Sequence, residues 1–261
     1  MRHWPKWLQV TVLAAGAIIA GNALNLLMPR FFGPSDPLMD SLPGLFLWAW
    51  ERPEDLRFLK PDEAGIAVLL AHIYIEEEGA PRMERRKQHL LLTPKTPLMA
   101  VVRIETKNVS GNPVQADQTA DHLMRVFDDA RLAAVQIDYD AGTSERAFYS
   151  MLLSRLRNRL PKRLPITMTA LASWCEGDRW IKALPAEEAV PMMFRMGPDS
   201  EEIRRTLAKG EGFTEPMCRT SLGLSTDESL KLPPRWEGRV YLFHPKPWTK
   251  EAYEAALKEL R

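Results

Sequence analysis

The segment AAVQIDYDA at residues 133–141 is the most informative part of the sequence, because it indicates both the fold and the first candidate site. It predicts a buried β-strand, in which side chains alternate between the two faces. Gln136, Asp138 and Asp140 therefore lie on one face, and the apolar residues from Val135 onward lie on the other. Two carboxylates about 7 Å apart on one strand face repel each other. We interpret this polar face as part of a functional site; the alternative is a strand end that is simply solvated.

Seven further segments have the length and apolar character of buried strands. Amphipathic helical patterns lie between several of them. Eight strands alternating with helices in about 220 residues predict an α/β fold, a small (β/α)8 barrel of the TIM type. A doubly wound open sheet is the alternative. The predicted strands cover residues 45–50, 66–75, 98–106, 134–140, 166–171, 190–195, 219–224 and 239–244.

Several predicted helices have recognisable start and end signals. Proline suits a first helical position, short polar side chains cap helices, and glycine is common after their last turn. Between the seventh and eighth strands, residues 226–231 leave room for only a turn or two. The signals are Pro53, Pro81, Ser144 before a helix over 145–160, and the capping-box pair Asp199 and Glu202 with Gly210 at the far end.

Composition limits the classes of partner. The 261 residues include 35 Lys and Arg against 34 Asp and Glu, a net charge of +1. The chain has no basic surplus of the kind that follows a phosphate backbone, so we do not expect nucleic acid as a partner. One basic cluster is interpreted as the solvated face of a short helix. It consists of Arg82, Arg85, Arg86 and Lys87.

The N-terminus predicts export from the cytoplasm. Arg2 and Lys6 precede an apolar run over 10–20, which is the pattern of a secretory signal. Uncharged residues continue over 7–28, long enough to span a membrane, so a retained anchor that contacts the membrane is nearly as well supported. A buried N-terminal helix is the third interpretation of this segment. We predict a periplasmic or other extracytoplasmic protein with a signal peptide or anchor over 1–28, a proline-rich linker over 29–43 and a barrel domain over 44–261.

The two cysteines, Cys175 and Cys218, are too few for a disulfide framework and lack the spacing of a zinc site. A single disulfide is compatible with export. However, the predicted strands place Cys175 after the fifth strand and Cys218 before the seventh, at opposite ends of a barrel. A bridge requires Cα atoms within about 7 Å, so we predict no structural disulfide.

The motifs of several enzyme classes are absent from the sequence. It contains no Gly-x-Ser-x-Gly nucleophile elbow, no Gly-x-x-x-x-Gly-Lys phosphate loop and no His-Glu-x-x-His helix. The five histidines are scattered singly. We therefore predict no cofactor and no metal, with one alternative, a divalent ion held by His72 and the two aspartates.

In a closed barrel helices cover the outside of the strands, so polar side chains in mid-strand should point inward or toward the mouth. These side chains gather near the C-terminal strand ends, where active sites of this architecture lie. Acids, arginines and aromatic rings together are typical of a carbohydrate pocket. The candidate catalytic residues are Asp138, Asp140, Glu76 and Glu105, and the candidate ligand-binding residues are Trp48, Trp50, Tyr74, Arg103, Arg195 and Asp227. The same rule selects His72, Gln136, Thr167, Thr169, Ser221 and Ser225.

Two pairs among these residues also have purely structural interpretations. Trp48 and Trp50 can be ordinary core residues, because aromatic side chains dominate protein cores. Arg103 and Glu105 can form a structural ion pair.

The sequence resembles a bacterial family, domain of unknown function 3142, over roughly residues 45–248. The blocks that carry the resemblance occur in a fixed order: VQIDYDA, SERAFY, TALASWC, VPMMFRMG, GLSTDE and VYLFHP. The family has no established reaction and is related to TIM-barrel glycoside hydrolases, so the resemblance implies the barrel. It also draws attention to Ser173, Trp174, Met196, Gly197 and Glu228 inside these blocks, and it adds Trp174 to the candidate ligand-binding residues.

The Asp-x-Asp strand is similar to that of chitinase-like barrels. Those enzymes keep a glutamate two residues after the second aspartate, where this chain has Gly142. The chitinase mechanism therefore does not follow from the resemblance.

We predict an exported or membrane-anchored barrel that binds a glycan or another polyol and hydrolyses a glycosidic bond. A non-catalytic carbohydrate-binding or envelope-associated protein on the same fold is the alternative. If Asp138 and Asp140 repel each other in a cleft, neither Asn substitution should lower the melting temperature by more than about 4 °C. If Arg103 or Arg195 holds the pair, removing one acid should cost about 3–5 kcal/mol.

Overall fold

The structure is a computed structural model that describes residues 36–106, 110–178 and 180–260. The predicted signal or anchor over 1–28 lies outside these ranges. Within them, no helix has both the length and the apolar character needed to cross a membrane.

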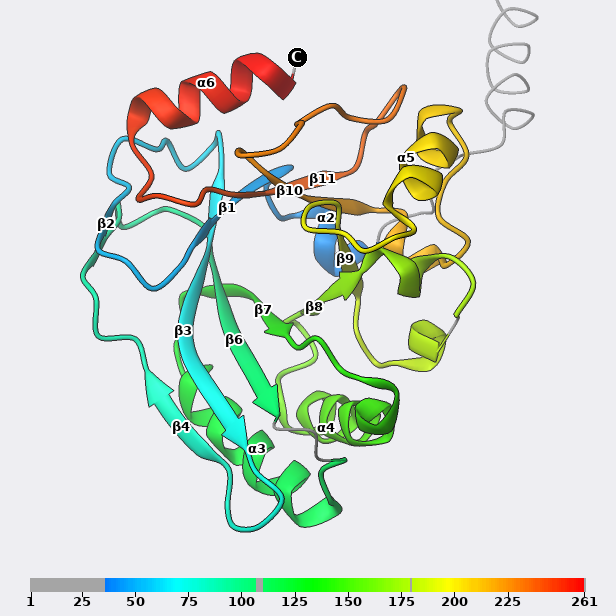
Figure 1. The fold of residues 1–261 in the computed structure, drawn as a ribbon. Coiled ribbons are helices and arrows are strands. Elements are labelled where there is room, and N and C mark those ends of the chain that lie inside the picture. Colours follow the sequence, from blue (N-terminus) through cyan, green and yellow to red (C-terminus); the bar gives the residue numbers. More distant parts are fainter. Residues whose placement is uncertain (1–35, 107–109, 179, 261) are drawn as a thin grey trace, which may run out of the picture. The chain divides into compact units, whose positions relative to one another are not determined.

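Eight parallel strands form a closed barrel (Figure 1). β1 pairs with β11 on one side and with β3 on the other, and this double pairing closes the sheet. The predicted TIM-type barrel is confirmed, and an open sheet is excluded because the barrel has no free edge between its first and last strands. The strands are β1 (Leu45–Ala49), β3 (Gly65–Ile75), β6 (Leu98–Thr106), β7 (Leu132–Asp138), β8 (Ile166–Leu171), β9 (Glu188–Met192), β10 (Ser221–Ser225) and β11 (Arg239–Phe243).

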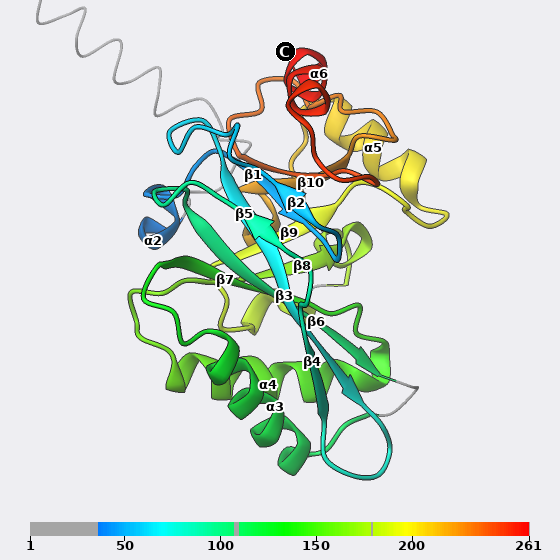
Figure 2. The same cartoon turned by 90° about the vertical axis from the view of Figure 1, so that its left-hand side faces the viewer.

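Within the described ranges, four α-helices of nine or more residues follow strands on the outside of the barrel. They are α3 (Pro113–Val126), α4 (Arg146–Arg159), α5 (Ser200–Ala208) and α6 (Lys250–Leu260). α3 and α4 lie side by side in both views (Figures 1 and 2). The other connections are loops, short strands and the 3₁₀ turns η1 (Thr143–Glu145), η2 (Ala172–Cys175), η3 (Trp180–Ala183) and η4 (Pro216–Cys218).

Helix α3 shows how local sequence sets an element. The Asn112 side chain accepts a hydrogen bond from the backbone N–H of Gln115 at 2.9 Å, and the Gln115 side-chain oxygen accepts one from the backbone N–H of Asn112 at 3.2 Å. Pro113 follows the cap at the first helical position, where its missing N–H costs nothing. By contrast, the predicted cap Ser144 lies inside η1, and the residue directly before α4 is Glu145. Neither Glu145 nor Asp199 before α5 makes a side-chain capping bond to the helix that follows, although Gly210 follows the end of α5 as predicted, with φ of +82°.

The predictions that helices begin at Pro53 and Pro81 are wrong. Pro53 precedes β2 (Glu54–Asp55), which pairs with β5 (Leu90–Leu91), and Pro81 precedes β4 (Arg82–Arg85). Proline also suits the first position of an edge strand, so it does not distinguish the two elements. β4 pairs antiparallel with the second half of β3, which continues beyond the barrel. The basic cluster thus begins on an edge strand, where charged side chains are common.

Large aromatic side chains fill the interior of the barrel. Phe46 and Trp48 both stack on Tyr241, with ring centroids 5.4 and 5.5 Å apart. Glycine leaves room for these rings on the neighbouring strands: a Cβ at Gly223 would lie 2.9 Å from the Trp48 ring, and one at Gly65 would overlap Phe46. A second, larger apolar layer lies between the outward faces of the strands and the helices.

Cys175 and Cys218 form a disulfide, with Cα atoms 5.8 Å apart, so the prediction of no bridge is wrong. The prediction failed because it was drawn from the strand positions alone and took no account of the course of the connections between strands. Cys175 lies in η2 after β8, and Cys218 lies in η4 before β10. The chain between α5 and β10 returns past η2, where the Glu215 backbone donates to the Cys175 carbonyl at 3.0 Å. Strand positions alone do not show where a long connection runs.

The described end of the predicted linker packs against the barrel. Asp36 caps the short helix α2 (Pro37–Asp40), in which Met39 is buried. The guanidinium of Arg239 donates to the carbonyl oxygens of Met39 at 2.6 Å and Pro43 at 2.9 Å. These bonds fix residues 36–43 at the N-terminal ends of the strands, opposite the mouth where the polar side chains gather.

Candidate functional site

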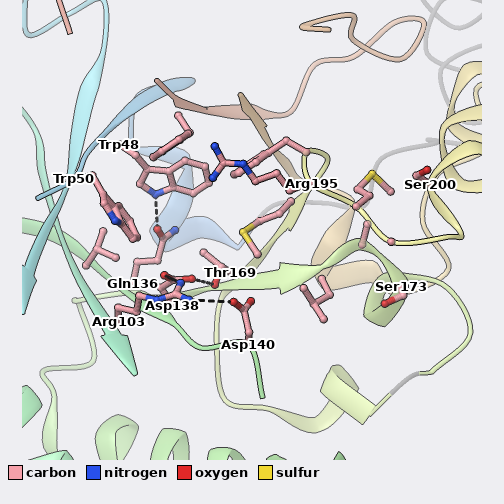
Figure 3. A pocket seen from close by; sticks show the side chains of 18 of the residues that line it. Trp48, Trp50, Arg103, Gln136, Asp138, Asp140, Thr169, Ser173, Arg195 and Ser200 are labelled. Atoms are coloured by element: carbon pink, nitrogen blue, oxygen red, sulfur yellow. Dashed lines mark hydrogen bonds and ion pairs between the residues drawn. The ribbon is translucent and has the colours of Figure 1, made fainter. Parts of the chain in front are cut away.

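A cavity of about 690 Å³ opens at the C-terminal ends of the barrel strands (Figure 3). Its lining divides into two contiguous halves of the barrel wall. The polar half comes from β3, β6, β7 and β8 and comprises His72, Arg103, Glu105, Gln136, Asp138, Asp140 and Thr169. The aromatic half comes from β11, β1 and the segment after β9 and comprises Trp48, Trp50, Phe194 and Phe243.

Arg103 is the centre of the polar half. Its guanidinium lies 2.7 Å from Asp138, 3.4 Å from Asp140 and 3.4 Å from Glu105. Burial alone would lower the pKa of Arg103, but the three carboxylates outweigh burial and raise it. The arginine therefore stays charged, and the repulsion between the two aspartates is offset by one cation that both contact.

Asp138 forms the buried floor of this cluster. Thr169 donates a hydrogen bond to one of its oxygens at 2.7 Å, and Arg103 holds the other. Only 4% of the Asp138 side chain is exposed, whereas Asp140 and Glu105 are each 43% exposed. Asp138 is thus an anchor, while Asp140 and Glu105 present carboxyl oxygens to a ligand.

Asp140 lies two residues beyond β7, at the cavity wall (Figure 3). Burial and the neighbouring Asp138 raise its pKa, and Arg103 offsets only part of that effect. A carboxyl group with a raised pKa and an exposed oxygen can donate a proton to a bound molecule.

His72 connects two further carboxylates. Its Nδ1 lies 3.3 Å from Glu105 and its Nε2 lies 2.9 Å from Glu51, while its own side chain is 10% exposed. Glu51 follows Trp50 directly, and its position is fixed from behind: Arg86 donates to the carbonyl oxygens of Trp50 and Arg52. The loop after β1 therefore places a carboxylate at the edge of the polar half.

The aromatic half has a buried part and an exposed part. Trp48 is 4% exposed and donates its indole N–H to Gln136 at 2.7 Å, so it acts mainly as a core residue beneath the cavity. Trp50 packs edge-on against Phe243, with centroids 6.2 Å apart, and Phe243 stacks on Phe194 at 5.8 Å. These partly exposed rings form an apolar wall that faces the polar half.

Arg195 adds a positive charge to the aromatic half. Its guanidinium lies over the Phe243 ring at 5.4 Å and 3.6 Å from Asp227, and its side chain is 60% exposed. Its backbone has φ of +49°, and its N–H donates to Glu228 at 2.8 Å. The loop after β9 is thus tied to the loop after β10.

Four candidate residues do not line the cavity. Tyr74 and Glu76 lie near or past the end of β3, where the strand pairs with β4 beyond the barrel; Tyr74 packs on His72 and under Arg82. Trp174 packs against Trp180 in the outer apolar layer, with centroids 4.9 Å apart. Asp227 lies outside the lining, where its carboxylate accepts a hydrogen bond from the Ser225 hydroxyl and forms an ion pair with Arg195.

Sequence reasoning missed three lining residues that matter for the chemistry: Glu51, Phe194 and Phe243. Glu51 lies beyond the predicted strand end, and alternation does not extend into a loop. Phe243 follows the alternation of β11 from Tyr241, so its inward direction was available from the sequence. Phe194 lies in the VPMMFRMG block beside Arg195, just past the end of β9.

The two aspartates are expected to respond differently to the same substitution. Asp138→Asn should lower the free energy of unfolding by about 2–3 kcal/mol, because the buried bonds from Thr169 and Arg103 lose their charged acceptor. Asp140→Asn should leave stability unchanged or raise it, because Arg103 keeps Asp138 and Glu105 as partners and is not left without a counter-charge. Its pKa lies above the usual 3.8, so ionisation as pH rises through that range disfavours the folded state, and Asn removes that charge.

Thermal unfolding at neutral pH measures this difference. The melting temperature of Asp138→Asn should fall by about 5–10 °C, and that of Asp140→Asn should stay within about 4 °C of the parent. Glu237→Gln, an exposed acid at the opposite end of the barrel, is the matched control. Equal losses in the two aspartate variants would contradict the assignment of Asp138 as the anchor.

Residues 94–187 match the family model described as "Domain of unknown function (DUF3142)", which confirms the resemblance seen in the sequence over that range. The range runs from before β6 to the end of the segment before β9, so it contains most of the polar half. No curated protein matches the chain.

Among solved structures, the chain is similar to the crystal structure of an endo-β-N-acetylglucosaminidase from Cordyceps militaris in apo form. The two share 10% sequence identity with a TM-score of 0.48, over 86% of this chain and 94% of that chain.

Proposed function

We propose that the cavity binds a carbohydrate and that the protein is a glycoside hydrolase-like enzyme. The observation that carries the proposal is the division of the cavity into an aromatic half and a polar half rich in carboxylates. Sugar rings have apolar faces that stack on aromatic side chains and hydroxyl edges that bond acids and arginines. A cavity of about 690 Å³ is large enough for a small saccharide.

The hydrolytic step requires two carboxyl groups on either side of the scissile bond. Asp140 is the proposed acid, because its raised pKa and exposed oxygen suit proton donation to the leaving oxygen. Glu105 is the proposed partner. Both carboxyl groups contact the guanidinium of Arg103, which keeps them within the ~5–10 Å that glycosidase pairs span.

A non-catalytic carbohydrate-binding protein is the second candidate. The observation that favours it is the position of Arg103, whose guanidinium contacts Asp138, Asp140 and Glu105 at once and so engages every candidate carboxylate of the polar half in an ion pair. In addition, Gly142 stands where chitinase-like barrels keep their acid.

A binding and turnover experiment distinguishes the candidates. Full-length protein is screened on a glycan array, and the best ligand is then tested for hydrolysis. We expect Trp50→Ala to weaken binding about five- to tenfold through lost stacking. Asp140→Asn should keep the affinity while lowering kcat about 10²- to 10⁴-fold.

The pH profile provides an independent check of the acid. The parent's kcat/KM should fall as pH rises through the raised pKa of Asp140, because the proton to be donated is lost. Binding without turnover in parent and variants alike favours the non-catalytic candidate. No ligand on the array would reject both, and Glu237→Gln controls for a general effect of removing an acid.

Export and membrane anchoring remain proposals. The charge pattern of the N-terminus supports them, and so does the disulfide between Cys175 and Cys218, because disulfides persist mainly in oxidising compartments outside the cytoplasm.

A further inference from the structure

The charge of the cavity narrows the class of carbohydrate. Five carboxylates line it against two guanidinium groups. The acids are Glu51, Glu105, Asp138, Asp140 and Asp199, and the cations are Arg103 and Arg195. Such an excess of negative charge in a partly enclosed site favours cationic ligands and repels anionic ones.

The cations present are already engaged. Arg103 is matched most closely by Asp138, at 2.7 Å. Arg195 lies beside Asp227, which is outside the lining, and over an aromatic ring. Behind Glu51, the half-buried Arg86 interacts electrostatically with Glu54 and, more weakly, with Glu51, and its guanidinium donates to backbone carbonyls. One guanidinium is thus shared by Asp138, Asp140 and Glu105 and the other lies beside Asp227, so the two arginines leave the acids of the cavity with a net negative charge.

The remaining acids are the accessible ones. The side chains of Glu51, Glu105 and Asp140 are 54%, 43% and 43% exposed. The first two flank His72, which lies against both and is nine-tenths buried. The field of these carboxylates reaches Tyr74, whose pKa is raised by burial and by Glu105, Glu84 and Glu51.

An aromatic ring lies next to this acidic edge. Trp50 precedes Glu51 in the chain and lines the cavity, so one short segment presents an indole ring and a carboxylate together. An ammonium group on a sugar ring would find a carboxylate partner there while the ring stacks on the indole, and aromatic faces themselves attract cations. A neutral acetamido group would gain neither charge interaction, and a uronic acid would be repelled.

We propose that the cavity selects saccharides that carry free amino groups, such as de-N-acetylated hexosamine oligomers, through Glu51 and Glu105. The inference rests on the proposed carbohydrate function and specifies its substrate class.

Three tetrasaccharides of matched length test the proposal: glucosamine, N-acetylglucosamine and galacturonic acid oligomers. Calorimetric titration of the full-length protein at about 20 mM and about 300 mM salt measures each affinity. We expect the glucosamine oligomer to bind at least tenfold more tightly than the N-acetylated one at low salt and to lose most of this advantage at high salt. The galacturonic acid oligomer should not bind.

Charge-neutral variants locate the effect. Glu51→Gln and Glu105→Gln should each weaken binding of the glucosamine oligomer about three- to tenfold more than they weaken binding of the N-acetylated oligomer, because only the former carries the charge that the carboxylate attracts. Glu237→Gln, an exposed acid at the opposite end of the barrel, should change neither affinity. Circular dichroism of both site variants checks that they fold, and Glu51 is exposed enough for its variant to do so.

The outcomes separate the inference from the function on which it rests. Equal or tighter binding of the N-acetylated or acidic oligomer would overturn the amino-sugar assignment and leave the carbohydrate function intact. Preference for glucosamine that is as strong in Glu51→Gln and Glu105→Gln as in the parent would also overturn it, because the charge would then act elsewhere on the surface. Failure of every saccharide, here and on the glycan array, would reject the carbohydrate function as well.

Discussion

Replacing Cys175 and Cys218 with serine is expected to lower the free energy of unfolding by about 4 kcal/mol. The reason is that the bridge restricts the conformations of the unfolded chain and so lowers its entropy. The disulfide joins residues 43 apart in the sequence. Both cysteines are fully buried, so the serine hydroxyls would also need hydrogen-bond partners that the apolar layer does not offer.

Urea denaturation of the parent and the double variant measures the difference. A Cys175→Ala and Cys218→Ala variant separates the two causes: it should retain the loss due to the bridge and avoid the cost of buried hydroxyls. Parent protein in reductant should approach the alanine variant. An unchanged denaturation midpoint in all three cases would mean that the two connections are held together without the bridge. Mass spectrometry of protein isolated from cells, without reductant, should find the bridge intact if the protein is exported.

Arg239→Met is expected to cost about 3–5 kcal/mol, because it leaves a buried carboxylate without its cation. Glu188 is 0% exposed inside the barrel, where Arg239 contacts it at 2.6 Å and the Tyr241 hydroxyl donates to it at 2.6 Å. The same guanidinium bonds the carbonyl oxygens of Met39 and Pro43. The substitution therefore also releases the segment that packs across the N-terminal ends of the strands.

The loss should depend on pH in a defined direction. Burial raises the pKa of Glu188 above 4.5, against the opposing effects of Arg239 and Tyr241. An acid with a raised pKa in the folded state stabilises the fold most below its unfolded pKa, and stability falls as pH rises through the folded value. Without Arg239 the folded pKa rises further, so Arg239→Met should be less destabilised at about pH 5 than at about pH 8.

A second substitution is the matched control. Glu188→Gln combined with Arg239→Met removes both charges and should recover part of the lost stability, because an uncharged amide is less costly to bury than an unpaired carboxylate. Urea denaturation at both pH values compares the parent, the single and the double variant. A double variant less stable than Arg239→Met at every pH would show that the carbonyl bonds to residues 39 and 43, and not the charge pair, carry the effect.

The strands were predictable because their information is local. A buried strand needs apolar residues over its length and polar ones at fixed alternation, and residues 133–141 meet that requirement without reference to any distant segment. The same alternation placed Gln136, Asp138 and Arg103 on the inward face, where the structure has them. Helix starts were less predictable, since proline at positions 53 and 81 suits a strand as well as a helix.

The candidate site was predictable only where it lies on strands. Tyr74 follows the side-chain alternation that predicted it at the mouth of the barrel. In the structure it lies near the end of β3, where that strand pairs with β4, and it does not line the cavity. Glu51 is the opposite case, a loop residue that pairing between distant segments brings to the cavity through Arg86. Whether Asp140, Glu105 and Trp50 act on a glycan is still a prediction.

Alternation within the sequence was enough to predict the number and order of the barrel strands and the inward face of most of them, because burial imposes a period of two on residues that are neighbours in the chain. It failed for β9, which turns Glu188 and Val190 inward, the opposite parity to the predicted Arg195. The tertiary structure was needed to show that Glu51 reaches His72, that Cys175 meets Cys218, and that the cavity has an aromatic and a polar half. Each of these depends on which distant segments lie together after the barrel closes. Such proximity is fixed by the path of the connections, and local composition carries no record of that path.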